Sequence, residues 1–252
     1  MRDDFYEQLR ARFKRLLQEE GLEQEPVAIS CRSLTPEEAI GKTRRQDFPI
    51  ISGKDVMIEA SFRAAKGQAF TDAPSNYQGS LADILALDLS GSSHDRAVFV
   101  AALNAVMAYL GHCCGTVHCR SEGPELCAGD LSLYLEEHYP ERKRVALIGY
   151  QPAMLEMLSK SKYALRVLDL SPLNIGEERY GVLVEDGRNS EIHDEIINNY
   201  ADLILCTGST ICNGTILDYL DLPVETVFFG TTISGAAVLM GLKRVCFADK
   251  YE

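Results

Sequence analysis

The sequence predicts an α/β protein in which an N-terminal α+β part is followed by a doubly wound, mainly parallel sheet. In the first half, a few extended runs are followed by helical periodicity, whereas from residue 144 onward short apolar runs alternate with helical segments. Continuous apolar strands that alternate with helices are typical of parallel strands buried on both faces. We therefore expect two domains, residues 1–120 and residues 121–252.

The first half is expected to contain strands and helices in succession. Phe5, Leu9 and Phe13 recur at helical spacing, which predicts an amphipathic N-terminal helix. A second helix, capped by Ser92 or Ser93, is apolar almost all round, which predicts burial on most of its faces. The expected helices are 3–20, 78–89 and DRAVFVAALNAVMAYLG (95–111), and the expected strands are EPVAISCRS (25–33), KDVMIEASF (54–62) and GQAFTD (67–72).

The second half alternates strictly between strand and helix patterns. After a bridging helix that begins near Pro124, the expected strands are RVALIGY (144–150), ALRVLDLS (164–171), ADLILCTG (201–208), VETVFFGT (224–231) and RVCFA (244–248). The expected helices between them are PAMLEMLSK (152–160), EIHDEIINNY (191–200), NGTILDYL (213–220) and SGAAVLMGL (234–242).

Composition excludes several classes of function. The net charge of −12 argues against nucleic acid as a partner, because binding phosphate backbones requires clustered Lys and Arg. No window approaches the length of a membrane span, and residues 1–21 carry no signal-peptide core. We therefore expect a cytoplasmic protein with no membrane partner, in which the eight cysteines stay reduced.

Candidate ligand-binding residues lie at the carboxyl ends of the predicted parallel strands. Ligands of open α/β sheets bind at these ends, where small residues and hydroxyls let the backbone approach them. The same residue types also suit turns and helix caps, so it is their location at the strand ends that favours a ligand site over a purely structural role. The candidates are Gly149, Tyr150, Pro152, Asp169, Thr207, Gly208, Asn213 and Thr231.

The first strand end departs from the dinucleotide-binding fingerprint. Tyr, Gln and Pro follow Gly149, where a fingerprint would place further glycines. Asp169 stands where a carboxylate could reach a ribose hydroxyl, but a single strand-end carboxylate is also a common turn former. Asn213 could either meet a ligand or cap the following helix. No cofactor and no nucleophile–base pair can be assigned.

Two further candidates come from the first half. Phe70 lies near the end of a predicted strand. Asn104 is a polar residue in an otherwise apolar helix, so its amide must either tie backbone segments together or face a cleft.

The stretch LGHCCGTVHCRSEGPELC (110–127) raises the question of a metal site. A structural zinc site usually has Cys-x-x-Cys pairs, whereas here the ligand types stand in adjacent pairs whose side chains diverge. Cys127 is explained as a small apolar residue on the apolar face of the helix expected to begin near Pro124. His118 and Cys119, in a polar loop before a helix, remain the candidate metal ligands.

The ordered motifs resemble a bacterial and archaeal family described as putative heavy-metal chelation. These motifs, spread over about residues 10 to 248, are KGQAFTD, AALNAVMAYLG, TVHCRSEGPELCA, VALIGYQP, VLDLSP, LILCTGSTICNGTI and VFFGTTISG. The resemblance implies an enolase N-terminal-like domain, a Rossmann-like domain and a site between them for a chelator-, flavin- or pterin-like molecule. The residues of this sequence that match recurrent positions of the family's motifs are Asn104, His118, Cys119, Gly149, Pro152, Asp169, Thr207, Gly208, Asn213, Gly214, Thr215 and Gly230.

One loop departs from this family. Residues 230–232 read Gly-Thr-Thr, where the resemblance leads us to expect Gly-Pro-Ser or Gly-Pro-Thr. The departure leaves open the turn geometry there and any donor role for Thr231.

Three functional hypotheses follow, and they leave open whether the protein is an enzyme. The first is a cytosolic protein that binds a small polar or metal-chelating molecule in an interdomain cleft. Phe70 and Asn104 would then help form one wall, with Tyr150 as a lid. The other wall would consist of Asp169, Thr207, Asn213 and Thr231. The second is a non-catalytic metal-binding or metal-sensing protein that uses His118, Cys119 and nearby thiols. The third is an adenosylmethionine-dependent methyltransferase with Asp169 on the ribose. A homodimer is compatible with each.

Overall fold

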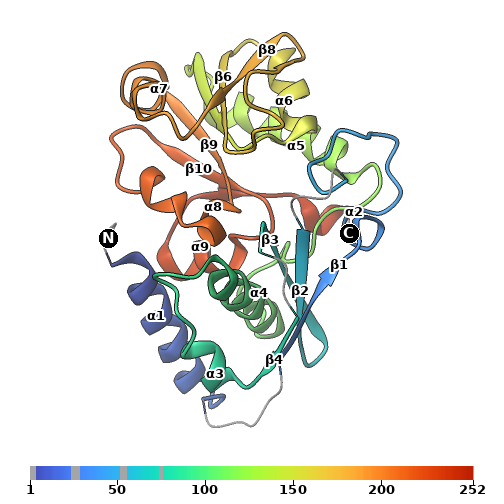
Figure 1. Cartoon of the computed structure of the whole chain (residues 1–252), viewed down its shortest axis with the longest axis vertical. Coiled ribbons are helices and arrows are strands. Elements are labelled where there is room, and N and C mark those ends of the chain that lie inside the picture. The colour runs from blue at the N-terminus through green and yellow to red at the C-terminus, as the bar shows by residue number, and fades with distance from the viewer. Residues whose placement is uncertain (1–3, 24–28, 52–55, 74–75, 252) are drawn as a thin grey trace.

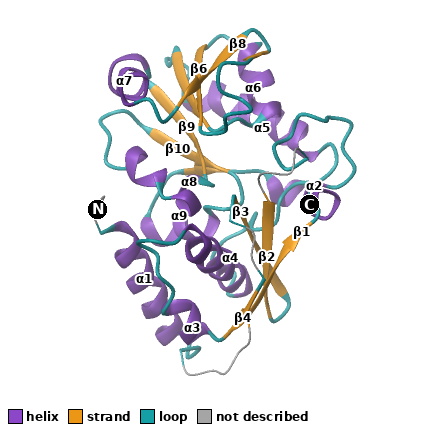
Figure 2. Ribbon diagram, in the orientation of Figure 1, coloured by secondary structure: helices purple, strands orange, loops and turns teal. Residues whose placement is uncertain are grey.

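The computed structural model describes residues 4–23, 29–51, 56–73 and 76–251. The chain folds around two sheets joined by packed helices (Figure 1 and Figure 2). One sheet is antiparallel, with strand order β3-β2-β1-β4, and the other is mostly parallel, with order β11-β10-β9-β5-β6-β8-β7. The α/β class and the order of its two parts are as the sequence predicts.

The first half supplies the antiparallel sheet and the central helix. Ser92 begins α4, because its side chain accepts a hydrogen bond from the Asp95 N–H. The expected helix 78–89 shrinks to α3, because residues 77–79 pair with β1 as β4. Residues 25–28, 54 and 55 of the expected strands lie outside the described residues. The elements are α1 (Phe5–Glu19), β1 (Ile29–Leu34), α2 (Pro36–Ile40), β2 (Val56–Phe62), β3 (Ala65–Thr71), β4 (Tyr77–Gly79), α3 (Leu81–Leu85) and α4 (Ser93–Tyr109).

The second half supplies the parallel sheet and its helices. Strands β7 and β8 form an antiparallel hairpin at one edge that the sequence did not predict. The elements are α5 (Gly123–His138), β5 (Arg144–Ile148), α6 (Pro152–Ser159), β6 (Ala164–Asp169), β7 (Glu178–Arg179), β8 (Val182–Asp186), α7 (Ser190–Asp194), the π-helix η1 (Glu195–Tyr200), β9 (Leu203–Thr207), α8 (Thr210–Asn213), the 3₁₀ helix η2 (Thr215–Tyr219), β10 (Thr226–Phe229), α9 (Ser234–Met240), β11 (Arg244–Val245) and the 3₁₀ helix η3 (Ala248–Lys250).

Helix α4 is the centre of the hydrophobic core. It packs against β2 and β3 on one side and against α8 and α9 on the other, so it links the two sheets (Figure 1). Residues 96–107 of the helix are all buried, as its apolar sequence predicts. Helix α1 covers its outer side, where Phe13 meets Phe99 in a T-shaped contact with ring centroids 5.7 Å apart.

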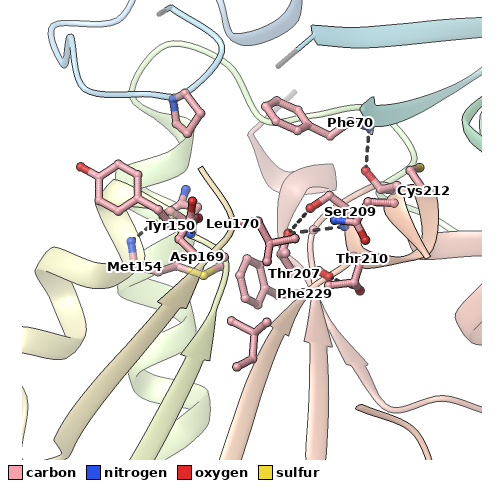
Figure 3. Close-up of a pocket in the computed structure, with 18 of the residues that line it drawn as sticks. Phe70, Tyr150, Met154, Asp169, Leu170, Thr207, Ser209, Thr210, Cys212 and Phe229 are labelled. Atoms are coloured by element: carbon pink, nitrogen blue, oxygen red, sulfur yellow. Dashed lines mark hydrogen bonds between the residues drawn. The ribbon is translucent and has the colours of Figure 1, made fainter. Parts of the chain in front are cut away.

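Both faces of the parallel sheet are covered. In β5, Val145 and Leu147 pack with α5 and α6, whereas Ala146 and Ile148 belong to the core that contains η1 and α9. This alternation explains why the strands read as continuous apolar runs. The carboxyl ends of the central strands therefore open at one edge, next to β3 of the other sheet (Figure 3). No helix among the residues described has the length and apolar character needed to cross a membrane.

Candidate functional site

A cavity of about 620 Å³ lies at the carboxyl ends of β5, β6, β9 and β10. The end of β3 and the segment before β2 close its other side, so residues from both sheets share one space (Figure 3). The cavity therefore lies where the strand-end rule places ligand sites in α/β sheets. Its walls include all of the predicted site residues except Asn104, namely Phe70, His118, Cys119, Gly149, Tyr150, Pro152, Asp169, Thr207, Gly208, Asn213 and Thr231.

Asn104 lies behind the wall and not in it. Its side chain is 0% exposed, and its amide nitrogen donates to the carbonyls of Gln68 at 3.0 Å and Thr232 at 2.9 Å. Its amide oxygen accepts from the Gly235 N–H at 2.8 Å. The sequence left two roles open for this amide, joining backbone segments or facing a cleft, and the structure shows the first. The expectation that Asn104 contacts a ligand is corrected accordingly, because its bonding groups are used within the protein.

Asp169 fastens two of the loops that shape the cavity. One carboxylate oxygen accepts the Tyr150 N–H at 2.6 Å, and the other accepts the Ser171 N–H at 2.7 Å. Asn174 adds a side-chain hydrogen bond at 3.2 Å. Both oxygens therefore help to hold the loops that follow β5 and β6 in place.

Glycines bring the ends of β5 and β9 close together. Gly149 has φ +88°, and a Cβ built on it would lie 2.6 Å from Cγ2 of Thr207. A Cβ on Gly208 would lie 2.8 Å from the backbone nitrogen of Ile233. Only glycine therefore fits at these two strand ends. The hydroxyls of Thr207 and Ser209, 3.1 Å apart, lie at the cavity where β9 ends (Figure 3).

The Gly-Thr-Thr loop joins the two sheets at the cavity. The Thr232 hydroxyl oxygen accepts the Phe70 N–H at 3.0 Å, which fixes the end of β3 against this loop. Thr231 is 3% exposed and lines the wall. The side chain of Thr232 therefore serves as a contact between the two halves of the chain.

Asn213 is placed differently from its expected position. It ends α8 and does not begin the next helix, because the left-handed Gly214 stops the α-helix after it. Its side-chain oxygen accepts the Thr215 N–H at 2.9 Å and the Thr215 hydroxyl at 2.8 Å. The prediction of a helix starting at Asn213 is thus wrong, although the side chain still reaches the cavity wall.

Three cysteines form one packed cluster in the cavity wall. Cys119 and Cys127 are buried, and Cys246, which follows β11, packs against them. The hydrogen bond that the Cys127 thiol donates to Cys119, together with burial, raises the pKa of Cys127 to about 11. Sequence reasoning missed Cys246, because no spacing pattern connects it with the 110–127 stretch.

His118 is turned toward its own backbone. Its Nδ1 donates to the Cys119 carbonyl at 2.6 Å, and its backbone N–H donates to the Gln68 side chain at 2.8 Å. Burial lowers the pKa of His118, which favours the neutral imidazole. Within the described part of the chain, no set of three or more His, Cys, Asp or Glu side chains is arranged to hold a metal ion.

A segment that the sequence reasoning missed covers one side of the cavity. We call residues 41–51 the strap, since it runs from α2 toward β2 beside α5 (Figure 1). Its residues Phe48, Pro49 and Ile50 line the cavity. No periodicity or motif marks this segment as part of a site.

Charged and phenolic groups fasten the strap. Arg45 bonds Glu125 of α5 at 3.1 Å and also pairs with Glu156 of α6. Asp47 accepts hydrogen bonds from the hydroxyls of Tyr180 at 2.7 Å and Tyr150 at 3.3 Å. Burial, reinforced by the Asp47 carboxylate, raises the pKa of Tyr150. The expected lid residue Tyr150 is therefore held as an anchor of the strap.

Releasing the strap should open the cavity and make the thiols that line it more accessible. We expect Arg45→Gln to raise the rate at which N-ethylmaleimide modifies Cys119, Cys127 and Cys246 by at least about tenfold, because charge-assisted hydrogen bonds contribute roughly 1.5–3 kcal/mol each. Peptide mass spectrometry measures the rate at each thiol. Arg44→Gln is the matched control, since the Arg44 side chain is 95% exposed. Equal rates in the two variants would contradict a closing role for Arg45.

Comparison with known proteins supports the family suggested by the motifs. Residues 133–243 match the sequence model of the family DUF364, described as putative heavy-metal chelation. No curated protein matches the sequence.

Two solved structures are similar to this chain, and both are proteins of unknown function from DUF364. The one from Pyrococcus horikoshii is 17% identical, with a TM-score of 0.46, over 89% of this chain and 79% of that one. The one from Desulfitobacterium hafniense is 14% identical, with a TM-score of 0.48, over 74% of this chain and 72% of that one. The resemblance to the family described as putative heavy-metal chelation is confirmed by the sequence match over residues 133–243.

Proposed function

We propose that this protein binds a small polar or metal-chelating molecule in the cavity, and that it acts in heavy-metal chelation or in the metabolism of a chelator. The observation that carries the proposal is the convergence of most of the motif residues on one cavity of about 620 Å³. This volume lies within the range of sites for small molecules and cofactors. The two expected domains would then serve as the two walls of one binding site.

The lining supports an organic ligand with both apolar and polar parts. Phe48, Met57 and Phe70 offer apolar and aromatic surface from the side of the antiparallel sheet. Thr207 and Ser209 offer hydroxyls from the side of the parallel sheet. A mainly apolar pocket with a few placed polar groups is typical of sites for ring-shaped ligands, which include chelator-, flavin- and pterin-like molecules.

The metal chemistry supports the same proposal. A closed structural metal site supplies about four protein ligands. The described residues offer no set of three or more such side chains, so they do not fit a structural metal site of that kind. A molecule that brings its own donor atoms to the cavity fits better.

Filling the cavity should weaken ligand binding. We expect at least one of riboflavin, pterin and 2,3-dihydroxybenzoate to bind the purified protein, and Ser209→Trp to weaken that binding at least about tenfold by occupying the space. Isothermal titration calorimetry measures both affinities. Ser190→Trp is the control, because Ser190 is exposed at the start of α7, outside the cavity wall. Failure of all three probes to bind, or equal binding by Ser209→Trp, would contradict the proposal.

A further inference from the structure

Three separate segments bring their thiols to one place in the cavity wall. Cys119 comes from the loop before α5, Cys127 from the first turns of α5, and Cys246 from the segment after β11. Their exposed fractions are 5% for Cys119 and 7% for Cys127, and Cys246 is half-buried. All three line the cavity, so a bound ion or molecule can reach them.

Cys127 is the central member of this cluster. Its thiol lies within hydrogen-bonding contact of the thiols of both Cys119 and Cys246. The eight cysteines are all free, so these sulfur atoms are not used in disulfides. Two thiols side by side at the wall of a cavity can both turn toward one soft metal ion and bind it.

A positive charge stands beside one of these thiols. Arg244 interacts electrostatically with Cys246. Its guanidinium is held in place by the carbonyls of Gly230 at 3.0 Å and Gly115 at 2.8 Å. Because both of these partners are neutral, the charge of Arg244 is available to balance an anionic complex at Cys246.

We propose that Cys127 and Cys246 form a two-sulfur site for Cu(I). Soft thiolate ligands favour Cu(I), zinc and iron–sulfur clusters, and of these zinc and the clusters usually require about four ligands. Cu(I) accepts two sulfur ligands in a linear arrangement, so the site needs no third protein ligand. The inference deepens the proposed function by naming a soft metal for the same cavity, and it rests on that function for how the ion is delivered.

The binding step balances without a redox partner. Each thiol releases its proton to water as its sulfur forms a bond to copper, and the copper stays in the +1 state. The resulting bis-thiolate complex carries one negative charge, which the Arg244 guanidinium offsets.

Competition for Cu(I) tests this site. The reduced, anaerobic protein is titrated into the coloured complex of Cu(I) with bicinchoninate, and loss of its absorbance measures transfer of copper to the protein. We expect the wild type to take one equivalent. Cys127→Ser and Cys246→Ser should each weaken binding by more than about a hundredfold, since even outer-shell partners of metal ligands cost 10–100-fold. Cys119→Ser should weaken it less than either.

Cys31→Ser is the matched control, because Cys31 is also buried but lies in β1, away from the cavity. Thermal melting by circular dichroism verifies that each variant is folded. Cys246 is half-buried whereas Cys127 is buried, so Cys246→Ser should disturb folding less than Cys127→Ser. No copper transfer to the wild type, or unchanged affinity in Cys127→Ser or Cys246→Ser, overturns the proposal.

The outcome is distinguishable from failure of the proposed function. Copper transfer uses Cu(I) alone, whereas the small-molecule test uses organic probes and Ser209→Trp. Loss of copper uptake with intact probe binding overturns only the copper site. Copper uptake without any probe binding supports the copper site and overturns only the proposed function.

Discussion

Replacing Gly67 with alanine should destabilise the protein by more than about 3 kcal/mol, through overpacking that the surroundings cannot absorb. Gly67 is the point where β3 lies against α4. A Cβ there would lie 2.2 Å from the Ala105 nitrogen and 2.4 Å from the Ala101 carbonyl oxygen. Both are backbone atoms of the central helix, so relief requires displacing α4 from the sheet.

Guanidinium unfolding followed by circular dichroism measures this effect. Gly129→Ala is the matched control, because Gly129 lies within α5 and a Cβ there would meet nothing within 4 Å. Alanine suits a helix interior better than glycine, so this control should gain about 0.5–1 kcal/mol. A Gly67→Ala protein within about 1 kcal/mol of the wild type would show that α4 does not pack as closely as described.

Replacing Asn104 with alanine should reduce the free energy of unfolding by about 3–5 kcal/mol, because buried backbone groups that lose their partners cost roughly 1–3 kcal/mol each. The Asn104 amide satisfies the Gln68 and Thr232 carbonyls and the Gly235 N–H, all in the interior. These groups belong to β3 and to the segment that leads into α9, so the substitution loosens the contact between the two sheets.

Denaturant unfolding of Asn104→Ala is compared with that of Asn198→Ala, an exposed position in η1 that should change stability by less than about 0.5 kcal/mol. Because Thr231 and Thr232 line the cavity, Asn104→Ala should also weaken binding of any probe that the wild type binds. Similar unfolding curves for the two variants would contradict the role assigned to Asn104.

The local pattern of the sequence predicted the parallel sheet well. The strands β5, β6, β9 and β10 are continuous apolar runs because both of their faces are buried, and that signal lies within each segment. The rule that ligands bind at strand ends then located part of the cavity wall without knowledge of the fold. Helix α4 was likewise predicted from its apolar surface alone.

Features that depend on distant contacts were missed. The β7–β8 hairpin lies at a sheet edge with partly exposed side chains, so its strands lack a continuous apolar run. Arg45 fastens the strap to two glutamates that lie 80 and 111 positions further along the chain. No local sequence pattern can predict contacts between residues so far apart. The same holds for Cys246, whose neighbours Cys119 and Cys127 come from another segment. Asn104 was recognised as unusual, but only the fold shows which backbone groups it bonds.

Mass spectrometry of the small molecules that co-purify with the native protein tests the central claim most directly. The protein is isolated under non-denaturing conditions, and the molecules released by denaturing it are identified for the wild type, Ser209→Trp and the Ser190→Trp control. If the cavity binds a ligand, a defined organic molecule should co-purify with the wild type and with Ser190→Trp at nearly one per protein chain. The same molecule should be absent from Ser209→Trp. The same molecule in equal amount on Ser209→Trp would contradict binding in this cavity.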